Sequence, residues 1–470
     1  MPIFVTRQAN VDSNAARRWR RGAVLAGALA LSGAAPAQQV ADAPATPYAR
    51  AIAAGYKAAM LCSGMFNAGR TQAQVERDEL AGIYPDYQPL IAALPATIDR
   101  AAGRVSVTFD DKLPPRVSTY TAGQGCRSEP IGSTPAAGTA VPPVRGADPR
   151  AWPMGDAGIA PRPSRALSAT IDRAFAGDFG AQAKTLGVVI LRDGRVAGER
   201  YGEEWGPFVS NRTWSVAKSI AGTLTGMAVM DGAVATDTPA RIAAWGQPGD
   251  PRAAIKLDQL LRMASGLHSD HAGNRTDAIY FGGTAMDEQA TGWPLEAAPG
   301  SRFRYANNDT LLAVRSLREA MGVAAYQRFP QTRLFDPLGM GHTVAEQDWR
   351  GNFILSSQVW STARDLARLG QLWLDDGMWQ GKRLLPEGWV RYMTTPAGPQ
   401  PAKGPGYGAT LWLFGPEQGL PQGSFAAQGN RGQYIMVVPS KRLVVVRRGE
   451  DGVGQGFDIA AFTRAVIDTE

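Results

Sequence analysis

A serine and a lysine stand three positions apart where an apolar, helix-like run begins. On a helix, Ser215 and Lys218 would share one face. Ser215 would lie in the first turn, where free backbone N–H groups and the helix dipole favour developing negative charge. A serine hydroxyl becomes nucleophilic when a base takes its proton, and Lys218 can act as that base if burial or nearby cations lower its pKa. The pair alone is not specific, because a capping serine beside a solvated lysine gives the same pattern.

A second motif, Tyr305-Ala306-Asn307, precedes an apolar run. A tyrosine near a lysine can move protons between a nucleophile and a leaving group, and an asparagine can bind both a lysine and a substrate carbonyl. A third motif, Gln-Gly-Asn-Arg-Gly-Gln at residues 428–433, lies between two strand-like runs. Its glycines let the backbone approach a ligand, and one of its N–H groups could complete an oxyanion hole. Taken singly, a buried tyrosine and an ordinary hairpin turn also account for these two motifs.

In this order, the three motifs resemble those of the serine β-lactamase and penicillin-binding-protein superfamily, in particular its class C-like branch. The resemblance extends over about residues 166–468, and the segment 429–433 is similar to that of the 6-aminohexanoate-dimer hydrolases and related esterases. Four further stretches resemble the same branch: residues 263–266, 299–305, 337–340 and 361–366. The resemblance implies an α+β fold, a β-lactamase/transpeptidase-like antiparallel sheet flanked by helices, with a helical subdomain.

The resemblance also implies a role for each residue of the first two motifs. Ser215 would be the acylated nucleophile, and Lys218 and Tyr305 would share general base and acid duty. Asn307 would hold Lys218 and the substrate. A complete set of these groups argues against a non-catalytic ligand-binding homologue, because a pure binder has no need of all of them.

The third motif departs from the pattern of the superfamily. The resemblance implies that the N–H of Asn430 joins that of the nucleophile in the oxyanion hole, and a slip of one or two residues would move this role to Gly429 or Gln428. No Lys or His precedes the strand glycine, because residues 426–429 are Ala-Ala-Gln-Gly. In the superfamily that cation helps to bind a β-lactam or peptide carboxylate. The absence of this cation argues against β-lactamase activity. It favours an amide or ester substrate that needs no carboxylate-binding cation, unless Arg431 takes the place of that cation.

A loop between the catalytic motifs carries His268, Asp270 and His271. We expect this loop to line the substrate cleft, where Asp270 and Asp277 could bind a substrate amino group; a solvated loop is the simpler alternative. A metal site here would need a third ligand such as Asp270. We therefore expect neither a metal nor a cofactor.

A sheet and several helices must bring the three motifs together. Alternating residues around the Asp-Gly pair at 193–194 predict a hairpin over 186–201, and strand-like runs return between 407 and 447. Helices are predicted at 167–175, 216–230, 311–321, 363–375, 387–393 and 459–467. The strands from both ends could pair into one antiparallel sheet within a hydrolase domain spanning 166–470, covered by the terminal helices.

The chain before that domain falls into three predicted parts. Residues 1–37 read as a signal peptide, with five arginines, an apolar stretch too short to span a bilayer, and an Ala-Pro-Ala cleavage site; a short amphipathic anchor is the alternative. Residues 38–131 form a small α+β extension that carries Cys62 and Cys126. Residues 132–165 are a Pro/Gly-rich linker. Export leads to an oxidising compartment, so we expect a Cys62–Cys126 disulfide, with two separate buried thiols as the alternative.

Composition narrows the class of partner. Hydrophobic residues make up 44% of the chain, which excludes intrinsic disorder. The net charge of +7 arises largely in the predicted signal peptide, so it gives no argument for nucleic-acid binding. No later stretch is apolar for long enough to form a transmembrane segment, and nothing indicates an oligomeric state.

These patterns lead to one functional prediction and two alternatives. We expect a periplasmic or secreted serine hydrolase that cleaves a small-molecule amide or ester, similar to the 6-aminohexanoate-dimer hydrolases. The alternatives are a β-lactamase or D-alanyl-D-alanine carboxypeptidase, and a ligand-binding homologue without activity.

Overall fold

The computed structural model describes residues 45–135, 137–269 and 276–469, and residues 45–470 form one compact unit. The predicted signal peptide lies outside the described residues, and so do Asp270 and His271. Within the described ranges, every helix is too short or too polar to cross a membrane.

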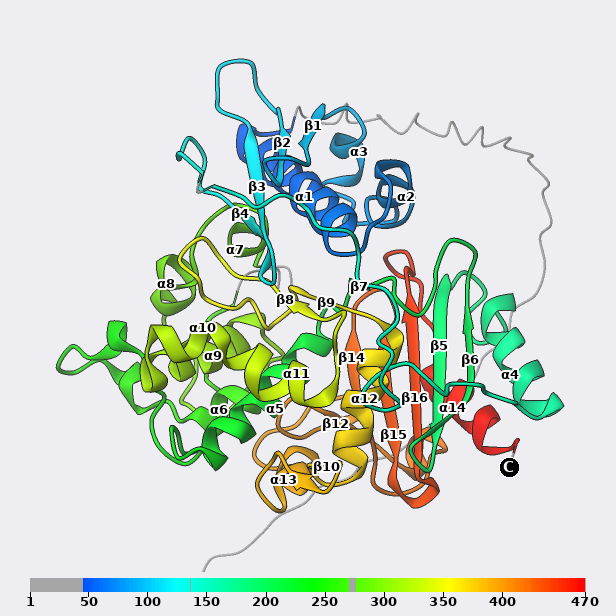
Figure 1. Cartoon of the computed structure of the whole chain (residues 1–470). Coiled ribbons are helices and arrows are strands. Elements are labelled where there is room, and N and C mark those ends of the chain that lie inside the picture. Colours follow the sequence, from blue (N-terminus) through cyan, green and yellow to red (C-terminus); the bar gives the residue numbers. More distant parts are fainter. Residues whose placement is uncertain (1–44, 136, 270–275, 470) are drawn as a thin grey trace, which may run out of the picture. The chain divides into compact units, whose positions relative to one another are not determined.

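A seven-stranded antiparallel sheet organises the C-terminal two thirds of the chain (Figure 1). Its order is β12-β13-β14-β15-β16-β5-β6, so the predicted hairpin pairs with the last strand of the chain and the two ends of the domain meet in one sheet. The strands are β5 (Thr185–Arg192), β6 (Arg195–Tyr201), β12 (Gly406–Tyr407), β13 (Trp412–Phe414), β14 (Ser424–Gly429), β15 (Gln433–Val438) and β16 (Leu443–Gly449).

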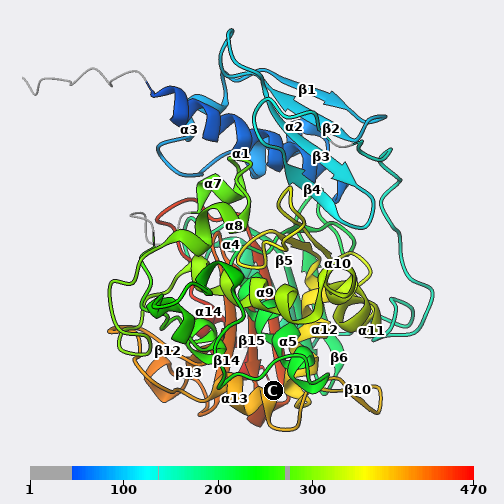
Figure 2. The same ribbon diagram turned by 90° about the vertical axis from the view of Figure 1, so that its left-hand side faces the viewer.

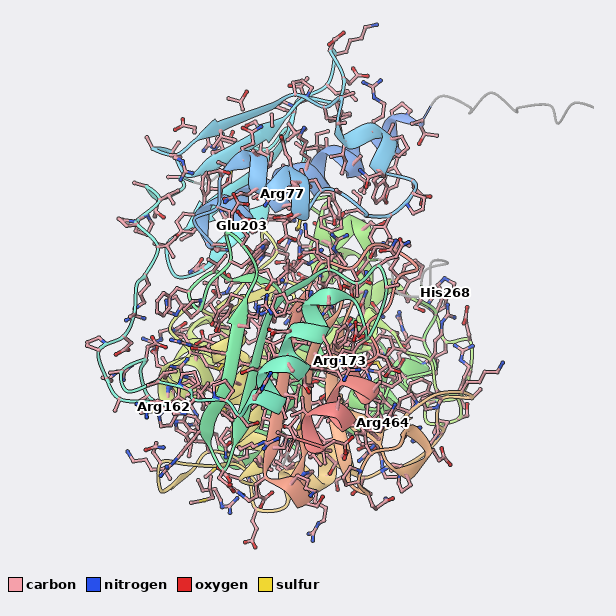
Figure 3. The ribbon with its side chains drawn as sticks, turned by 90° about the vertical axis from the view of Figure 1, so that its right-hand side faces the viewer. Arg77, Arg162, Arg173, Glu203, His268 and Arg464 are labelled. Carbon is pink, nitrogen blue, oxygen red and sulfur yellow. A yellow bond between two sulfur atoms is a disulfide. The ribbon has the colours of Figure 1, made fainter. Side chains whose placement is uncertain are left out.

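Helices cover both faces of this sheet, because successive side chains of a strand point to opposite sides. On one face, Val188 and Ile190 pack against α4 (Arg165–Ala176) and α14 (Ile459–Ile467), which lie side by side (Figure 3). On the other face, the sheet packs against α5 (Val216–Met230) and α12 (Ala363–Leu374). This arrangement confirms the predicted α+β fold with an antiparallel sheet between helices.

A helical subdomain surrounds α9, which contacts both α5 and α6. It is joined to the sheet domain by a small sheet of order β7-β9-β8, whose first strand leads directly into α5. The elements of this region are α6 (Leu257–Leu261), α7 (Asp277–Tyr280), α8 (Met286–Gln289), α9 (Asn307–Met321), α10 (Val323–Pro330), α11 (Asp336–Leu338), α13 (Trp389–Thr394), β7 (Asn211–Arg212), β8 (Val344–Ala345), β9 (Val359–Ser361), β10 (Met378–Trp379) and β11 (Lys382–Arg383).

The N-terminal extension packs a long buried helix against a four-stranded antiparallel sheet of order β1-β2-β3-β4 (Figures 1 and 2). The disulfide between Cys62 and Cys126 ties the helix α1 to the strand β4. The other side of α1 contacts α7, and the Tyr56 and Phe281 ring centroids are 4.6 Å apart. The elements are α1 (Pro47–Phe66), α2 (Gln72–Asp78), α3 (Gln88–Ile91), β1 (Ala96–Asp99), β2 (Arg104–Val107), β3 (Arg116–Thr121) and β4 (Gly125–Ser128).

The segment predicted as a linker lies along the sheet domain. Trp152 Nε1 donates to the Gly194 carbonyl at 2.8 Å, and the Arg368 guanidinium donates to the carbonyls of Pro153 and Gly155 at 2.7 and 2.6 Å. The helix α4 then begins at Arg165, two residues before the helix predicted at 167–175.

Candidate active site

Ser215 stands where β7 turns into α5. The residue before it, Trp214, has a φ of 50°, in the left-handed region that costs a non-glycine residue about 1–3 kcal/mol. Val216 begins the helix, so Ser215 occupies its N-terminal position. The strained turn therefore presents the serine hydroxyl at the end of the helix where backbone N–H groups are free.

Lys218 reaches back to the serine from the first turn of α5. Its Nζ lies 3.0 Å from Ser215 Oγ and also donates to Asn307 Oδ1 at 2.6 Å and to the Ser356 carbonyl at 2.9 Å. The side chain is buried, with an exposed fraction of 1% for the residue. These contacts hold the amine in one place beside the hydroxyl.

Burial changes the proton affinity of that amine. Desolvation is the larger cause and the charge of Arg212 the second, and together they lower the pKa of Lys218 to about 7. At neutral pH a large fraction of the side chain is therefore the free amine, which can accept the proton of Ser215.

Tyr305 also interacts with the side chain of the proposed nucleophile. Burial raises the pKa of its phenol to about 12, and the interaction of its hydroxyl with the Ser215 side chain opposes this effect. The Lys218 amine lies 5.0 Å from the Tyr305 ring centroid. The phenol therefore stays protonated at neutral pH, which suits it to deliver a proton rather than to remove one.

Aromatic rings form a wall beside this group. The ring centroids of Tyr407 and Trp412 lie 5.9 and 5.2 Å from that of Tyr305, and those of Phe303 and Tyr407 are 5.4 Å apart. Tyr407 is buried, whereas Tyr305 and Trp412 are partly exposed, so these two rings can contact an apolar portion of a substrate.

The end of β14 lies against the backbone that enters α5. A Cβ added to Gly429 would come within 2.4 Å of the Thr213 carbonyl oxygen and 3.1 Å of the Ser215 nitrogen. A glycine is therefore needed here for the close approach of the two backbones. Asn430 follows in the turn between β14 and β15, and its own side chain accepts a hydrogen bond from the Arg431 N–H at 2.9 Å.

The Arg431 side chain does not replace the missing cation of β14. Its guanidinium is buried against Glu450 and donates to the carbonyls of Asp78, Ala81 and Gly82 in the N-terminal extension. Residues 426–429 of β14 are Ala-Ala-Gln-Gly, so this strand brings no charged side chain to the site.

The loop candidates have other contacts. Asp277 accepts a hydrogen bond from the Tyr87 hydroxyl at 2.5 Å, which joins α7 to the N-terminal extension. His268 contacts Glu296, which also pairs with Arg302 and Arg304 at 3.0 and 3.1 Å. Among the residues described, no group of three or more His, Cys, Asp and Glu side chains is arranged to hold a metal ion.

Two members of the site were not predicted. Ser356 contributes its backbone carbonyl, which any residue type would supply. The amino-acid sequence therefore could not predict this contact. Arg212 could have been noticed as an arginine in the apolar approach to the nucleophile, three residues before Ser215.

Residues 171–448 match the sequence model of the Beta-lactamase family, which is more than half of the chain. The protein therefore belongs to this family, whose fold is that of the serine β-lactamases and penicillin-binding proteins. This confirms the family predicted from the three motifs.

Solved structures agree with this assignment. A protein assigned as a 6-aminohexanoate-dimer hydrolase from Bacillus anthracis is 20% identical, with a TM-score of 0.53, over 63% of this chain and 80% of that one. A class C β-lactamase in complex with cefoxitin is 14% identical, with a TM-score of 0.50, over 65% of this chain and 98% of its own. A family VIII carboxylesterase is 13% identical, with a TM-score of 0.52, over 66% and 99%. At these identities the likeness shows the fold.

Proposed function

We propose that the protein is an exported serine hydrolase that opens an amide or ester bond of a small molecule through an acyl-enzyme on Ser215. The observation that carries this proposal is the Lys218 amine, buried, held by three contacts and 3.0 Å from the Ser215 hydroxyl. A solvated lysine beside a capping serine would need neither the burial nor the lowered pKa.

The proposed reaction has two halves. In the first, the free amine of Lys218 takes the proton of Ser215 while Oγ attacks the substrate carbonyl carbon. The N–H groups of Ser215 and Asn430 stabilise the oxyanion. Tyr305 gives its proton to the leaving amine or alcohol as the bond to the carbonyl carbon breaks, and Lys218 returns the proton taken from Ser215 to Tyr305. In the second half, Lys218 takes a proton from water while the water oxygen attacks the carbonyl carbon of the acyl-enzyme. The bond from that carbon to Ser215 Oγ then breaks, Oγ takes up the proton held by Lys218, and the acid is released.

We infer the substrate class from the residues that lie beside Ser215 and Tyr305. A carboxylate anchor on β14 is lacking, and aromatic rings line the other side near Tyr305. This favours an amide or ester that has an apolar chain and no carboxylate close to the scissile bond, over a β-lactam or a D-alanyl-D-alanine peptide. A linear 6-aminohexanoate dimer meets this condition, because a chain of methylene groups separates its carboxylate from the amide. The names of the similar hydrolase and carboxylesterase structures support the same class.

We also propose a periplasmic or secreted location. The disulfide in the N-terminal extension supports it, since such bonds persist in oxidising compartments. Residues 1–37 would then be the signal peptide, 38–131 the extension, 132–165 the linker and 166–470 the hydrolase domain.

A fluorophosphonate probe followed by intact-mass measurement tests the nucleophile. We expect one adduct on the wild-type protein and none on Ser215→Ala. Ser219→Ala is the matched control, because Ser219 lies one turn further along the same helix and donates to the Thr410 carbonyl. Folded wild-type protein that stays unlabelled would favour a binding protein without activity.

A substrate panel tests the class of bond. We expect turnover of 4-nitrophenyl butyrate or of a linear 6-aminohexanoate dimer, and slower turnover of a chromogenic cephalosporin. A cephalosporin rate well above both others would support the β-lactamase alternative instead.

A further inference from the structure

Arg212 is a buried cation beside the proposed catalytic groups. It ends β7, three residues before Ser215, and its exposed fraction is 0%. Its guanidinium carbon lies 3.8 Å from the Trp214 ring centroid and 5.5 and 5.4 Å from those of Tyr280 and Phe281. Aromatic faces therefore enclose the guanidinium on several sides.

The guanidinium has few hydrogen bonds for a buried arginine. Nη2 donates to Ser357 Oγ at 2.7 Å, whereas Nε and Nη1 have no hydrogen-bond partner within the described residues. Buried arginines are normally paired with a carboxylate, as Arg447 is with Asp451 at 2.8 Å. Burying the Arg212 guanidinium therefore costs folding free energy. No carboxylate neutralises its charge through an ion pair among the described residues, so that charge acts on neighbouring groups.

The groups that Arg212 faces come from several elements. Its charge acts on Lys218 of α5, on Tyr56 of α1, on Tyr280 of α7, and on two buried carboxyl groups, Glu79 and Glu346. Burial raises the pKa of both carboxyl groups, that of Glu346 to about 7. Neither carboxyl group forms an ion pair with Arg212 among the described residues. Glu79 pairs with Arg70 at 3.4 Å, and Glu346 accepts hydrogen bonds from the N-terminal extension.

The surroundings of Lys218 itself are otherwise neutral. Its contacts are the Ser215 hydroxyl, the Asn307 amide oxygen, the Ser356 carbonyl and the Tyr305 ring. Arg212 and Lys218 also bind consecutive residues, because Arg212 donates to Ser357 Oγ and Lys218 to the Ser356 carbonyl. Apart from burial, the charge that lowers the pKa of this amine is that of Arg212.

We propose that Arg212 is a positioning residue whose unpaired, buried charge keeps Lys218 in the free-amine form that the nucleophile requires. It is fully buried, so it touches no substrate and acts through Lys218. The same side chain supports the strained turn at Trp214 by stacking on it. The inference rests on the proposed function, since it assigns the base of that reaction.

The pH dependence of ester hydrolysis tests this role. In wild type, kcat/KM for 4-nitrophenyl butyrate, corrected with Ser215→Ala, should rise with pH around a midpoint near 7. In Arg212→Met and Arg212→Gln the amine holds its proton more tightly, so the midpoint should move up by about one pH unit or more, with at least about a fivefold lower rate at pH 7. Much of the loss should be recovered at pH 9. Arg212→Lys keeps the charge and should keep the midpoint closer to that of wild type.

Arg447→Gln is the control for loss of a buried arginine, because Arg447 pairs with Asp451 and is not among the charges that shift the pKa of Lys218. It should lower the temperature of unfolding and leave the midpoint unchanged. Neutral Arg212 variants that fold and lose rate equally at every pH would overturn the proposal, since that is the result of a purely structural role.

Two further outcomes have to be considered. If neither neutral variant folds, the pH profile of wild type decides. A midpoint near 7 supports the proposal. A rate that is flat from pH 5.5 to 9, or that rises only above pH 9, overturns it. If wild-type protein neither reacts with the fluorophosphonate nor hydrolyses any ester or amide, the proposed function fails first. Labelling at Ser215 with an unshifted midpoint in Arg212→Met contradicts the arginine's role alone.

Discussion

At the scale of single residues, burial shifts the pKa values of two titratable side chains, Lys218 and Tyr305, in opposite directions. Desolvation disfavours the charged form, which is the protonated form of a lysine and the deprotonated form of a tyrosine. The pKa of Lys218 therefore falls to about 7 and that of Tyr305 rises to about 12. Both side chains interact with the Ser215 hydroxyl, and in the proposed mechanism this difference makes the lysine the base and the tyrosine the acid.

Replacing the phenol separates these roles. Tyr305→Phe should lower kcat for an amide or ester by about 10²–10³-fold, because the leaving group loses its proton donor. The rise of kcat/KM around pH 7 should remain, since Lys218 is unchanged. The measurement is a full pH profile of both parameters.

Tyr326→Phe controls for the removal of a buried phenol. Tyr326 accepts a hydrogen bond from the Phe353 N–H in the helical subdomain, away from the proposed site. It should cost some stability and leave the rate within a few-fold of wild type. A Tyr305→Phe variant as active as this control would remove the tyrosine from the mechanism.

At the scale of secondary structure, three elements converge on Ser215. The turn after β7 presents the Ser215 hydroxyl, and α5 presents the Lys218 amine one turn later. The end of β14 lies against the backbone of Thr213 and Ser215, where the turn enters α5. The approach of β14 depends on a residue without a side chain, which makes Gly429 the most sensitive position of the strand.

Gly429→Ala tests this convergence. The added Cβ would meet the Thr213 carbonyl at 2.4 Å, so β14 must move away from the start of α5. We expect kcat to fall by about 10²–10³-fold, the cost of losing one donor of an oxyanion hole. Overpacking should also cost about 1–3 kcal/mol of unfolding free energy.

The matched control is Gly456→Ala, because a Cβ there meets no atom within 4 Å. Its activity should equal that of wild type. If Gly429→Ala kept its full rate while losing stability, the end of β14 would have no part in stabilising the oxyanion.

At the scale of the whole described chain, the N-terminal extension is bonded to the family domain through a buried carboxyl group. Glu346 Oε1 accepts hydrogen bonds from Ser63 Oγ, Asn67 Nδ2 and the Cys126 N–H at 2.6, 2.9 and 3.0 Å. The disulfide lies at the same place, since Cys126 is one of the donors and Cys62 precedes Ser63. The extension thus packs on the segment that also carries Ser356 and Ser357.

The charge state of Glu346 should make stability depend on pH. Burial raises its pKa from 4.5 to about 7, so the folded protein binds this proton more tightly than the unfolded chain. The associated stability is fully present below about pH 4.5 and is lost as the pH rises through 7.

Glu346→Gln, which is never charged, should remove that dependence. Relative to wild type, its free energy of unfolding should increase between pH 5 and pH 8, by a few kcal/mol at most. Denaturant unfolding at the two pH values measures this difference, and Glu417→Gln, at an exposed position, should show none. An equal difference at both pH values would contradict the burial of a protonated carboxyl group at this contact.

Short-range patterns were enough to predict much of the fold. The helix predicted at 216–230 is α5 (Val216–Met230), and the hairpin predicted over 186–201 is β5 and β6. These segments could be predicted because the spacing of apolar residues and the Asp-Gly turn act within a few positions. For the same reason, a serine and a lysine three apart at a helix start were expected to share a face.

Other features depend on contacts between distant parts of the chain. The Ser356 carbonyl, 138 residues from Lys218, holds the amine through an atom that every residue possesses. Arg431 was considered as a substitute for the missing cation of the third motif, but it binds carbonyls of the N-terminal extension about 350 positions away. The unpaired state of Arg212 likewise follows from which side chains close around it. Hydrogen bonding, burial and charge compensation at these positions depend on how distant segments pack together. A local pattern of residue types cannot predict that packing.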